Sequence, residues 1–449
     1  MSGCKQHISR LARWRAKVPL PTKLGYWKFL RSYRGVKTTL QRAGRIYARY
    51  GFSPRQLIGS ISEFIDHLQA QGCSLTLPVT AQVVSKFPRV FRELSRTGVE
   101  FAVHGLAHLD YTLLAPERVE RDLRQALSVF EQAGVPVSGF RFPYLRCNRA
   151  LLQILERLPF EYDSSIPCFW PKHLDILRHG NGVLHRMIDQ YQPTSPERVP
   201  VLPAAQGPLV ELPVSLPDDD ILFDRIPAKR RNVVSGIWIA ILQEVHARGE
   251  LFVLQLHPER YRFLKNALAA VLEEAASLGG VWIAPLGEIV RWWKRRREWK
   301  PALSFADGRV EVVVDLSPAF QAALLEPARR EQPEPDWQAV VRDGHYRYRG
   351  TLLPFIGLGE GVGTGFESRL RDLGFYTTRE FPPRQTSVFL AREPEEDNLR
   401  LWLRQLRAHL PGPLIRIAPW PEGYCCALAI TGDIDALTIQ DFFHRIHEY

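Results

Sequence analysis

Apolar residues follow two alternating patterns along the first two thirds of the chain. Over residues 53–71 and 116–133 they recur every three or four positions, which is the spacing of one face of an α-helix. Four short apolar runs have the length of buried strands: residues 73–79, 99–103, 251–256 and 281–284. Strands that alternate with helices predict βα units, and therefore an α/β fold with a parallel sheet or barrel.

A histidine or an arginine stands at the end of three apolar runs. His104 follows the run 99–103, Arg141 follows Phe140, and His257 follows the run 251–256. In (β/α) barrels the functional side chains collect at the carboxyl ends of the strands. We therefore expect these three side chains to lie together on one rim.

His104 and His108 are four positions apart. If the chain turns helical after Gly105, both imidazoles lie on one face and can reach a single metal ion. The spacing alone is weak evidence, because in a chain with thirteen histidines such a pair is more often of ordinary surface or core residues.

Positive charge is concentrated at the N-terminus. Residues 1–62 contain fourteen of the 59 Lys and Arg residues, and all 48 Asp and Glu residues follow. Such an arm can bind an anionic membrane surface, nucleic acid or an acidic polymer, or can be a solvated tail. Aromatic residues interleave with its charges, which favours a membrane surface. We expect no specific nucleic-acid partner.

The sequence lacks features of a membrane-spanning or exported protein. It has no run of about eighteen uncharged apolar residues, and no apolar segment of a secretory signal follows its basic start. The six cysteines show no CxxC motif and no regular spacing, which predicts reduced thiols. A cytoplasmic protein, with association to a membrane surface as an alternative, is the expectation.

Changes in composition divide the chain into four segments. These are a basic arm (1–50), an α/β unit (51–300), a small α+β module of unknown role (301–418) and a C-terminal strand and helix (419–449). Residues 171–209 have weak periodicity and predict a long excursion from the α/β unit. Residues 357–365 hold five glycines and predict a flexible surface loop. The acids of residues 218–220 predict a solvated or helix-capping cluster, or the edge of a substrate groove.

Four motifs in order resemble the polysaccharide deacetylase family, also called the NodB-homology or carbohydrate esterase 4 group. They are H-x-x-x-H at 104–108, R-x-P-Y at 141–144, the aspartate of 162–165 (YDSS), and L-x-L-H-P at 254–258. The resemblance covers roughly residues 50–295 and implies a distorted (β/α) barrel. It also implies metal-dependent removal of N-acetyl groups from amino sugars of a glycan. Some relatives open cyclic ureides instead, so the resemblance is more specific for amide hydrolysis than for a sugar.

The family places two aspartates on its first strand, and none stands at that position here. The C-terminal run 425–432 is followed by Asp433 and Asp435. The D-x-D-A sequence at 433–436 is similar to the missing motif. Aspartates at alternate positions of a strand end share a side. Because the first and last strands of a barrel are neighbours, we hypothesise a circular permutation that completes the site within one chain. The alternatives are a swapped homodimer, or a truncated remnant without catalysis.

The resemblance assigns a role to each matching residue. Asp435, His104 and His108 would bind a divalent metal, with Zn²⁺ first and Co²⁺, Ni²⁺ or Fe²⁺ as alternatives. Asp433 would be the general base and Arg141 would orient it. The backbone N–H at Tyr144 would stabilise the oxyanion, and His257 would be the general acid, with Asp163 setting its charge. Leu256 and Trp170 would line the acetyl pocket. The alternative function is an inactive protein of this fold that binds glycan or an anionic membrane surface.

Overall fold

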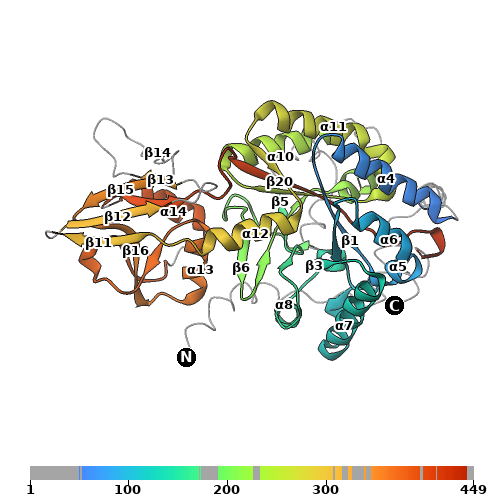
Figure 1. The fold of residues 1–449 in the computed structure, drawn as a ribbon, viewed down its shortest axis with the longest axis horizontal. Coiled ribbons are helices and arrows are strands. Elements are labelled where there is room, and N and C mark those ends of the chain that lie inside the picture. The colour runs from blue at the N-terminus through green and yellow to red at the C-terminus, as the bar shows by residue number, and fades with distance from the viewer. Residues whose placement is uncertain are drawn as a thin grey trace.

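The computed structural model describes residues 50, 53–170, 172, 191–225, 233–306, 309–315, 322–325, 338–339, 345–394, 398–410 and 412–441. Apart from Tyr50, the predicted basic arm lies outside these residues, and so do residues 171 and 173–190 of the excursion at 171–209. The chain forms a larger lobe, in which helices surround a curled sheet, and a smaller lobe rich in strands (Figure 1). Among the described residues, no helix combines the length and hydrophobicity needed to cross a bilayer.

The sheet of the larger lobe has eleven strands in the order β5-β8-β9-β20-β1-β2-β3-β4-β7-β6, with β10 also paired to β20. All pairs are parallel except β6 with β7. The strands are β1 (Thr76–Val79), β2 (Glu100–Val103), β3 (Val137–Phe140), β4 (Tyr162–Asp163), β5 (Pro167–Phe169), β6 (Ala204–Gln206), β7 (Leu209–Glu211), β8 (Val214–Leu216), β9 (Leu251–Leu256), β10 (Val281–Ile283) and β20 (Cys426–Gly432). The predicted α/β barrel-type fold is confirmed, with β5 and β6 at the two ends of the described sheet.

Strand β20 comes from the C-terminal end of the described chain and lies in the middle of this sheet. It pairs with β9 along its length, and its other side faces β10 at its start and β1 at its end. All seven of its residues are buried. A Cβ at Gly432 would lie 2.9 Å from the Leu77 side chain and 3.0 Å from that of Phe64, so this close packing requires glycine.

Helices cover the outer side of the sheet. They are α4 (Pro54–Gln69), α5 (Ala81–Lys86), α6 (Pro88–Ser95), α7 (Pro116–Ala133), α8 (Arg149–Leu155), α10 (Val234–Arg248), α11 (Tyr261–Leu278) and α12 (Leu286–Arg297). In α7, Pro116 occupies the first turn, and Gly134 ends the helix in the left-handed conformation, as helix-capping rules predict. The neighbouring strands β7 and β8 lie in different parts of the sheet, because β7 pairs with β4 whereas β8 pairs with β5 and β9.

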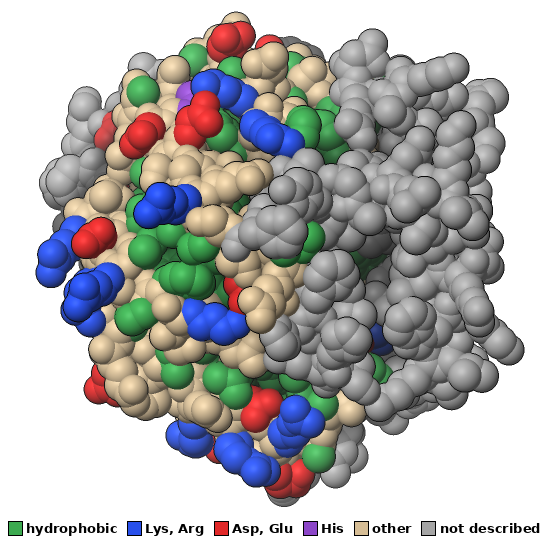
Figure 2. All heavy atoms as spheres, turned by 90° about the vertical axis from the view of Figure 1, so that its right-hand side faces the viewer, with side chains coloured by type: hydrophobic (Ala, Val, Ile, Leu, Met, Phe, Trp, Pro, Cys, Tyr) green, Lys and Arg blue, Asp and Glu red, His purple; other side chains and the backbone are tan. Residues whose placement is uncertain are grey.

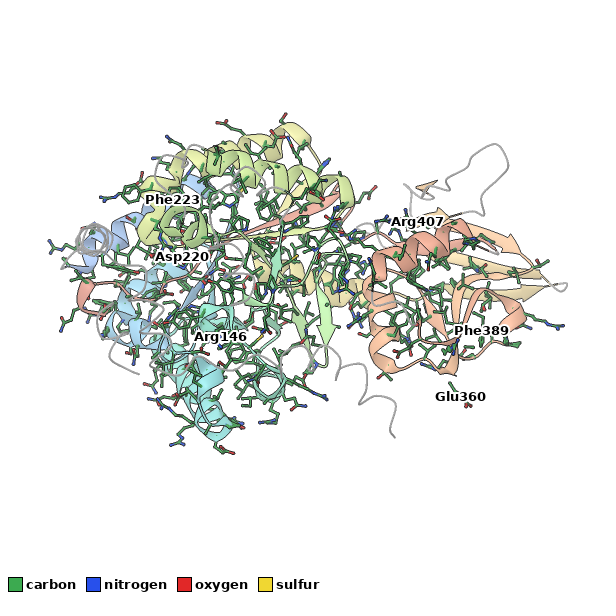
Figure 3. All side chains as sticks on the ribbon, turned by 180° about the vertical axis from the view of Figure 1, so that it is seen from behind. Arg146, Asp220, Phe223, Glu360, Phe389 and Arg407 are labelled. Atoms are coloured by element: carbon green, nitrogen blue, oxygen red, sulfur yellow. The ribbon has the colours of Figure 1, made fainter. Side chains whose placement is uncertain are left out.

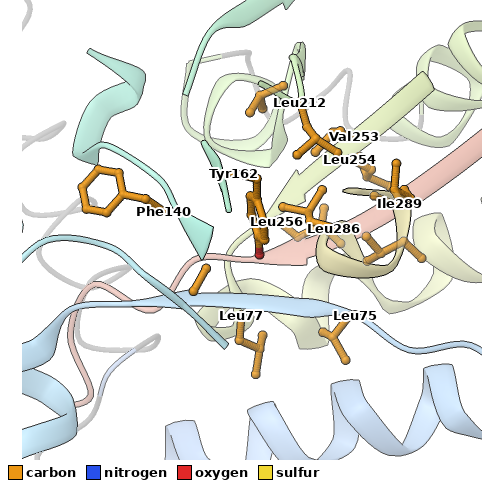
Figure 4. Packing of buried hydrophobic residues seen from close by; sticks show 14 of the residues in the cluster. Leu75, Leu77, Phe140, Tyr162, Leu212, Val253, Leu254, Leu256, Leu286 and Ile289 are labelled. Carbon is orange, nitrogen blue, oxygen red and sulfur yellow. The ribbon is translucent and has the colours of Figure 1, made fainter. Parts of the chain in front are cut away.

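The core lies between the sheet and these helices (Figure 4). Leu77, Leu254 and Leu256 contribute from three strands, and Leu286 and Ile289 contribute from α12. Each of these five side chains is at most 1% exposed. Burial of one leucine or isoleucine stabilises the fold by about 1.5–3 kcal/mol, so this cluster fixes the strand order that brings the candidate residues together.

The smaller lobe consists of short sheets and two helices. Its elements are β11 (Ala302–Ala306), β12 (Arg309–Asp315), β13 (Ala322–Leu325), β14 (Gln338–Ala339), β15 (His345–Gly350), β16 (Leu353–Gly361), α13 (Thr364–Asp372), β17 (Thr377–Thr378), β18 (Thr386–Arg392), α14 (Leu399–Ala408) and β19 (Leu414–Ile417). The flexible loop predicted at 357–365 is wrong, because this stretch is the end of β16 and the start of α13. Gly359 and Gly361 allow the backbone of β18 to approach closely.

The C-terminal end of α12 joins the two lobes. Trp292, Trp293 and Arg296 are buried there. The Arg296 guanidinium donates to the carbonyl oxygens of Ala418 and Ile417 at 2.8 and 3.0 Å. Burial lowers the pKa of Arg296 to about 9. The basic last turn of α12 is therefore part of the contact between the lobes.

The surface of the larger lobe carries both signs of charge. On the face that lies at the right in Figure 1, Lys and Arg side chains are interspersed with Asp and Glu over the described area (Figure 2). The described part of this face therefore does not have the single-sign field that a strongly anionic partner would require.

Candidate functional site

Four neighbouring strands end at the candidate site. His104 follows β2, Arg141 follows β3, His257 follows β9, and Asp433 and Asp435 follow β20. These strands are parallel and lie side by side with β1, so their carboxyl ends point to one rim. The structure thus brings two histidines and two aspartates together although they are about 330 positions apart in sequence.

His104, His108 and Asp435 form a compact group of metal-binding atoms. The Nε2 atom of His104 lies 3.4 Å from Oδ1 of Asp435, and Nε2 of His108 lies 3.3 Å from Oδ2. Both imidazoles are buried, and the side chain of Asp435 is 7% exposed. One ligand atom from each residue lies within 4.8 Å of the others. Two imidazoles and one carboxylate are a common ligand set for Zn²⁺ and other divalent metals.

The two histidines meet on a turn and not on the predicted helix. Residues 104–110 have no helical conformation, and Gly105 has a left-handed φ of 83°. A Cβ at Gly105 would lie 2.7 Å from the Tyr111 hydroxyl, which accepts a hydrogen bond from the Leu106 backbone N–H. The tight turn therefore produces the proximity that was expected from helical periodicity.

A hydrogen bond orients His104 toward the acidic group. Its Nδ1 atom lies 2.9 Å from the carbonyl oxygen of Arg141. A carbonyl can only accept, so Nδ1 carries the proton and Nε2 presents its lone pair toward Asp435. This is the arrangement that a metal-binding histidine requires, and the residues present therefore fit a divalent metal.

Asp433 is held between two donors beside these ligands. Arg141 Nη1 donates to its Oδ1 at 2.7 Å, and Gln255 Nε2 donates to its Oδ2 at 2.8 Å. Its Oδ2 atom also lies 4.0 Å from His104 Nε2. Arg141 is fully buried and is fixed further by Ser164. The Asp433 carboxylate is thus oriented by one cation and one neutral amide, and it lies close to the ligand group.

His257 is paired with Asp219 and not with Asp163. Its Nδ1 atom lies 2.6 Å from Asp219 Oδ1, and its backbone N–H donates to Asp219 Oδ2 at 2.9 Å. Burial opposes the charged imidazole, but the Asp219 carboxylate outweighs it and raises the pKa of His257 well above the usual value. The Asp219 carboxylate therefore favours the charged form of the His257 imidazole. The prediction that Asp163 sets this charge is wrong, because a different carboxylate contacts the ring.

The acidic triplet is partly buried and not a solvated cluster. Asp218 is 3% exposed and Asp219 is fully buried, while Asp220 begins a π-helical turn (Asp220–Arg225) and binds Arg260 at 2.7 Å. Burial, together with the Asp220 and Asp219 carboxylates, raises the pKa of Asp218 to about 7. Asp218, Asp219 and His257 also lie within 4.8 Å of one another. A protonated imidazole cannot coordinate a cation, so this second group is less suited to a metal.

The residues of the R-x-P-Y motif form a turn beside the histidines, here called the proline turn (residues 142–145). Tyr144 and Leu145 have left-handed φ values of 60° and 51°. The Tyr144 ring packs edge-on against His108, with ring centroids 4.4 Å apart. Beyond the turn, Arg146 forms an ion pair with Asp110, and Figure 3 shows Arg146 and Asp220 on the same lobe. The Tyr144 side chain of the proline turn therefore lies next to the ligand group.

The two residues expected to line an acetyl pocket differ in position. Leu256 is the buried last residue of β9, and its carbonyl accepts from the Asp433 N–H at 2.9 Å. The Trp170 ring instead lies 5.7 Å from the guanidinium of Arg248, near the end of α10. Contact with an acetyl group stays a prediction for both residues.

Sequence reasoning missed Gln255 and Asp219, which contact Asp433 and His257, and Glu211, which lies opposite Asp163. Gln255 interrupts an otherwise apolar strand, and this single polar position was a usable signal. Asp219 was noted only as part of the acidic triplet. Glu211 lies opposite Asp163 on β7, and its position depended on the split strand at 209–216 that periodicity did not reveal.

The comparisons with known proteins concern the larger lobe. Residues 59–163 match the family model for polysaccharide deacetylase. A peptidoglycan deacetylase-like protein of Gibberella zeae is 28% identical over 116 residues, which are 26% of this chain and 34% of that protein. The chain therefore spans about a third of the length of the curated relative that it matches.

Two solved structures are similar at low identity. A Mycobacterium smegmatis protein provisionally assigned as a polysaccharide deacetylase is 22% identical, with a TM-score of 0.40, and the match covers 58% of this chain and 83% of that one. PuuE allantoinase is 16% identical, with a TM-score of 0.41, and the match covers 54% and 74%.

Proposed function

Because this chain contains a domain of the polysaccharide deacetylase family, the NodB-homology group, we propose that it hydrolyses N-acetyl groups of amino sugars in a glycan with a divalent metal. One observation carries the proposal: two buried imidazoles and the Asp435 carboxylate converge, and Asp433 is held beside them. Zinc is the first candidate for the metal, and cobalt, nickel and iron suit the same ligands.

In this proposal Asp435, His104 and His108 hold the metal. The metal would supply Lewis-acid chemistry, which lowers the pKa of the attacking water and polarises the acetyl carbonyl. Asp433 accepts the proton of that water, because Arg141 and Gln255 orient its carboxylate toward the ligand group.

Two further groups complete the reaction. The backbone N–H at Tyr144 donates to the oxyanion of the tetrahedral species, since the proline turn lies against His108. His257 protonates the leaving amine, and its pairing with Asp219 supports that role because it keeps the imidazole charged. The result is acetate and a free amino sugar.

We also propose that the barrel is circularly permuted. The position of β20 between β9 and β1 supports this interpretation, because the resemblance expects the Asp-x-Asp motif on the family's first strand. Residues 301–418 would then be a module inserted between the last and first strands of the permuted barrel.

Acetate release tests the proposed function. The full chain is loaded with Zn²⁺ and incubated with acetylated chito-oligosaccharides, acetylated peptidoglycan fragments and allantoin as separate substrates. We expect acetate from an acetylated glycan, and a loss of about 10²-fold or more in kcat for Asp433→Asn and His257→Ala. Glu422→Gln, a change at an exposed position near β20, serves as the control.

Three outcomes separate the alternatives. Glycan binding without acetate release by the metal-loaded chain would contradict the proposal and favour the inactive binding protein. Ring opening of allantoin without acetate release would retain amide hydrolysis and overturn the glycan substrate. Activity that increases with the square of protein concentration would favour the swapped dimer over completion within one chain.

A further inference from the structure

Asp163 and Glu211 form a buried carboxyl pair that the proposed reaction does not use. They lie directly opposite each other on the parallel strands β4 and β7, and they are 1% and 2% exposed. Parallel neighbours at matching positions point to the same side of a sheet, so the two carboxyl groups face one another. Two buried carboxylates that face each other repel strongly unless one of them holds a proton.

The hydrogen bonds of this pair identify where that proton is required. Oδ1 of Asp163 accepts from the Ser165 hydroxyl at 2.5 Å, and Oε1 of Glu211 accepts from the Ile166 N–H at 2.8 Å. The other oxygens, Oδ2 and Oε2, are buried, and no N–H or O–H donor of the described chain reaches them. Because the two carboxyl groups face each other, a proton between them would satisfy these oxygens.

The preference for protonation agrees with this geometry. Burial raises the pKa of Glu211 well above its usual range, and the neighbouring Asp163 carboxylate adds to the effect. Burial also raises the pKa of Asp163, to about 6, while its bonds to Ser165 and Glu211 oppose the rise. Both directions therefore favour one proton held between the two carboxyl groups.

Ser165 connects the pair to the proline turn. Its hydroxyl donates to Asp163, and the same oxygen accepts from the Phe142 backbone N–H at 2.8 Å. Phe142 is the first residue of the turn, and it is followed by Pro143, which has no N–H, and by the left-handed Tyr144. A shift of Ser165 would therefore move the turn that carries the Tyr144 N–H, the oxyanion donor of the proposed function.

We propose that Asp163 and Glu211 share one proton and, through Ser165, position the proline turn for catalysis. Both are positioning residues, because the described contacts connect them to the turn and not to the ligand group. The catalytic consequence rests on the proposed function, whereas the ordering of the turn does not.

Amide substitutions separate a shared proton from two independent groups. In Asp163→Asn the new amide N–H can donate to Glu211, and in Glu211→Gln the new amide can donate to Asp163, so each single variant keeps one donor between the residues. The double variant places two NH₂ groups against each other, because the accepting oxygens stay directed to Ser165 and Ile166. The double variant should therefore loosen the proline turn by much more than the product of the two single-variant effects.

Amide hydrogen exchange tests the turn without activity. In the full chain we expect exchange in residues 141–146 to be about tenfold faster or more in the double variant and in Ser165→Ala, with the single amide variants closer to wild type. Ser85→Ala, at an exposed hydroxyl on α5, is the matched control. Exchange in residues 54–69 reports whether the lobe as a whole has loosened.

Kinetics test the catalytic part. A displaced oxyanion donor lowers kcat by about 10-fold or more with KM and metal content unchanged. The proposal would be overturned if hydrogen exchange of residues 141–146 in the double variant equals the product of the two single-variant effects. Exchange at the wild-type rate in the double variant would overturn it too. If the wild type releases no acetate, the proposed function fails, and the exchange data alone still decide whether the pair orders the turn.

Discussion

The pairing of His257 with Asp219 predicts a specific response to Asp219→Asn. The substitution keeps the shape of the side chain and removes a fully buried negative charge 2.6 Å from the imidazole. Burial and the nearby Arg260, whose Nη1 lies 3.5 Å from Asp219, then lower the pKa of His257, and the weaker effect of the Glu259 carboxylate is left to oppose them. Removal of an opposite charge at this distance lowers a pKa by about 1–3 units, which is about 1–4 kcal/mol.

The same pairing sets the pH range of stability. The raised pKa of His257 contributes stability that is fully present below the ordinary value of 6.5 and is lost as the pH rises through the folded value. The lowered pKa of Asp219 contributes stability that is present above 3.8 and is lost as the pH falls through the folded value. The free energy of unfolding of the wild type should therefore exceed that of Asp219→Asn most between pH 3.8 and pH 6.5.

Two measurements test this prediction. The NMR titration of the His257 ring follows its pKa directly, and the basic limb of the kcat/KM profile reports the same proton donor. We expect both to move to lower pH in Asp219→Asn, with a smaller effect in Asp220→Asn, whose side chain is 29% exposed and binds Arg260. An unchanged ring titration in Asp219→Asn would refute the assignment of the charge of His257 to this carboxylate.

Two other predictions concern the packing of the C-terminal strand. Arg141→Met leaves the buried Asp433 without its cation and should destabilise the fold by about 3–5 kcal/mol in urea unfolding; a change below about 1 kcal/mol would contradict the buried pair. Gly432→Ala places a Cβ 2.9 Å from Leu77 and should cost about 1–3 kcal/mol. Gly59→Ala, in the open middle of α4, should instead stabilise by roughly 0.5–1 kcal/mol, and equal effects of the two would show that β20 packs elsewhere.

The sequence was informative where polar residues ended apolar runs. His104, Arg141 and His257 could be predicted on one rim because parallel strands direct their carboxyl ends to the same side. The aspartates of β20 required the resemblance, since composition alone does not indicate which strand a distant segment joins. They lie close to His104 because β20 is positioned between β9 and β1 in the sheet.

Other features could not be predicted because tertiary contacts decide them. The partner of His257 depended on the path of the acidic triplet, and that path depends on the separation of β7 from β8. The glycines of 357–365 indicated a loop, whereas close packing against β18 makes them part of a strand. The turn that carries His104 and His108 shows the same limit. Its shape depends on the Tyr111 hydroxyl, which packs against Gly105 and accepts from the Leu106 N–H.

Metal binding by Asp435→Asn tests the central claim most directly. The purified full chain and the variant are titrated with Zn²⁺ by calorimetry, with Glu422→Gln as the matched control on the same C-terminal segment. If the tail supplies a ligand to His104 and His108, the variant binds about 10²-fold more weakly or not at all, and the control keeps one ion per chain. Equal affinity and stoichiometry in all three proteins would show that the C-terminal aspartate does not complete a metal site.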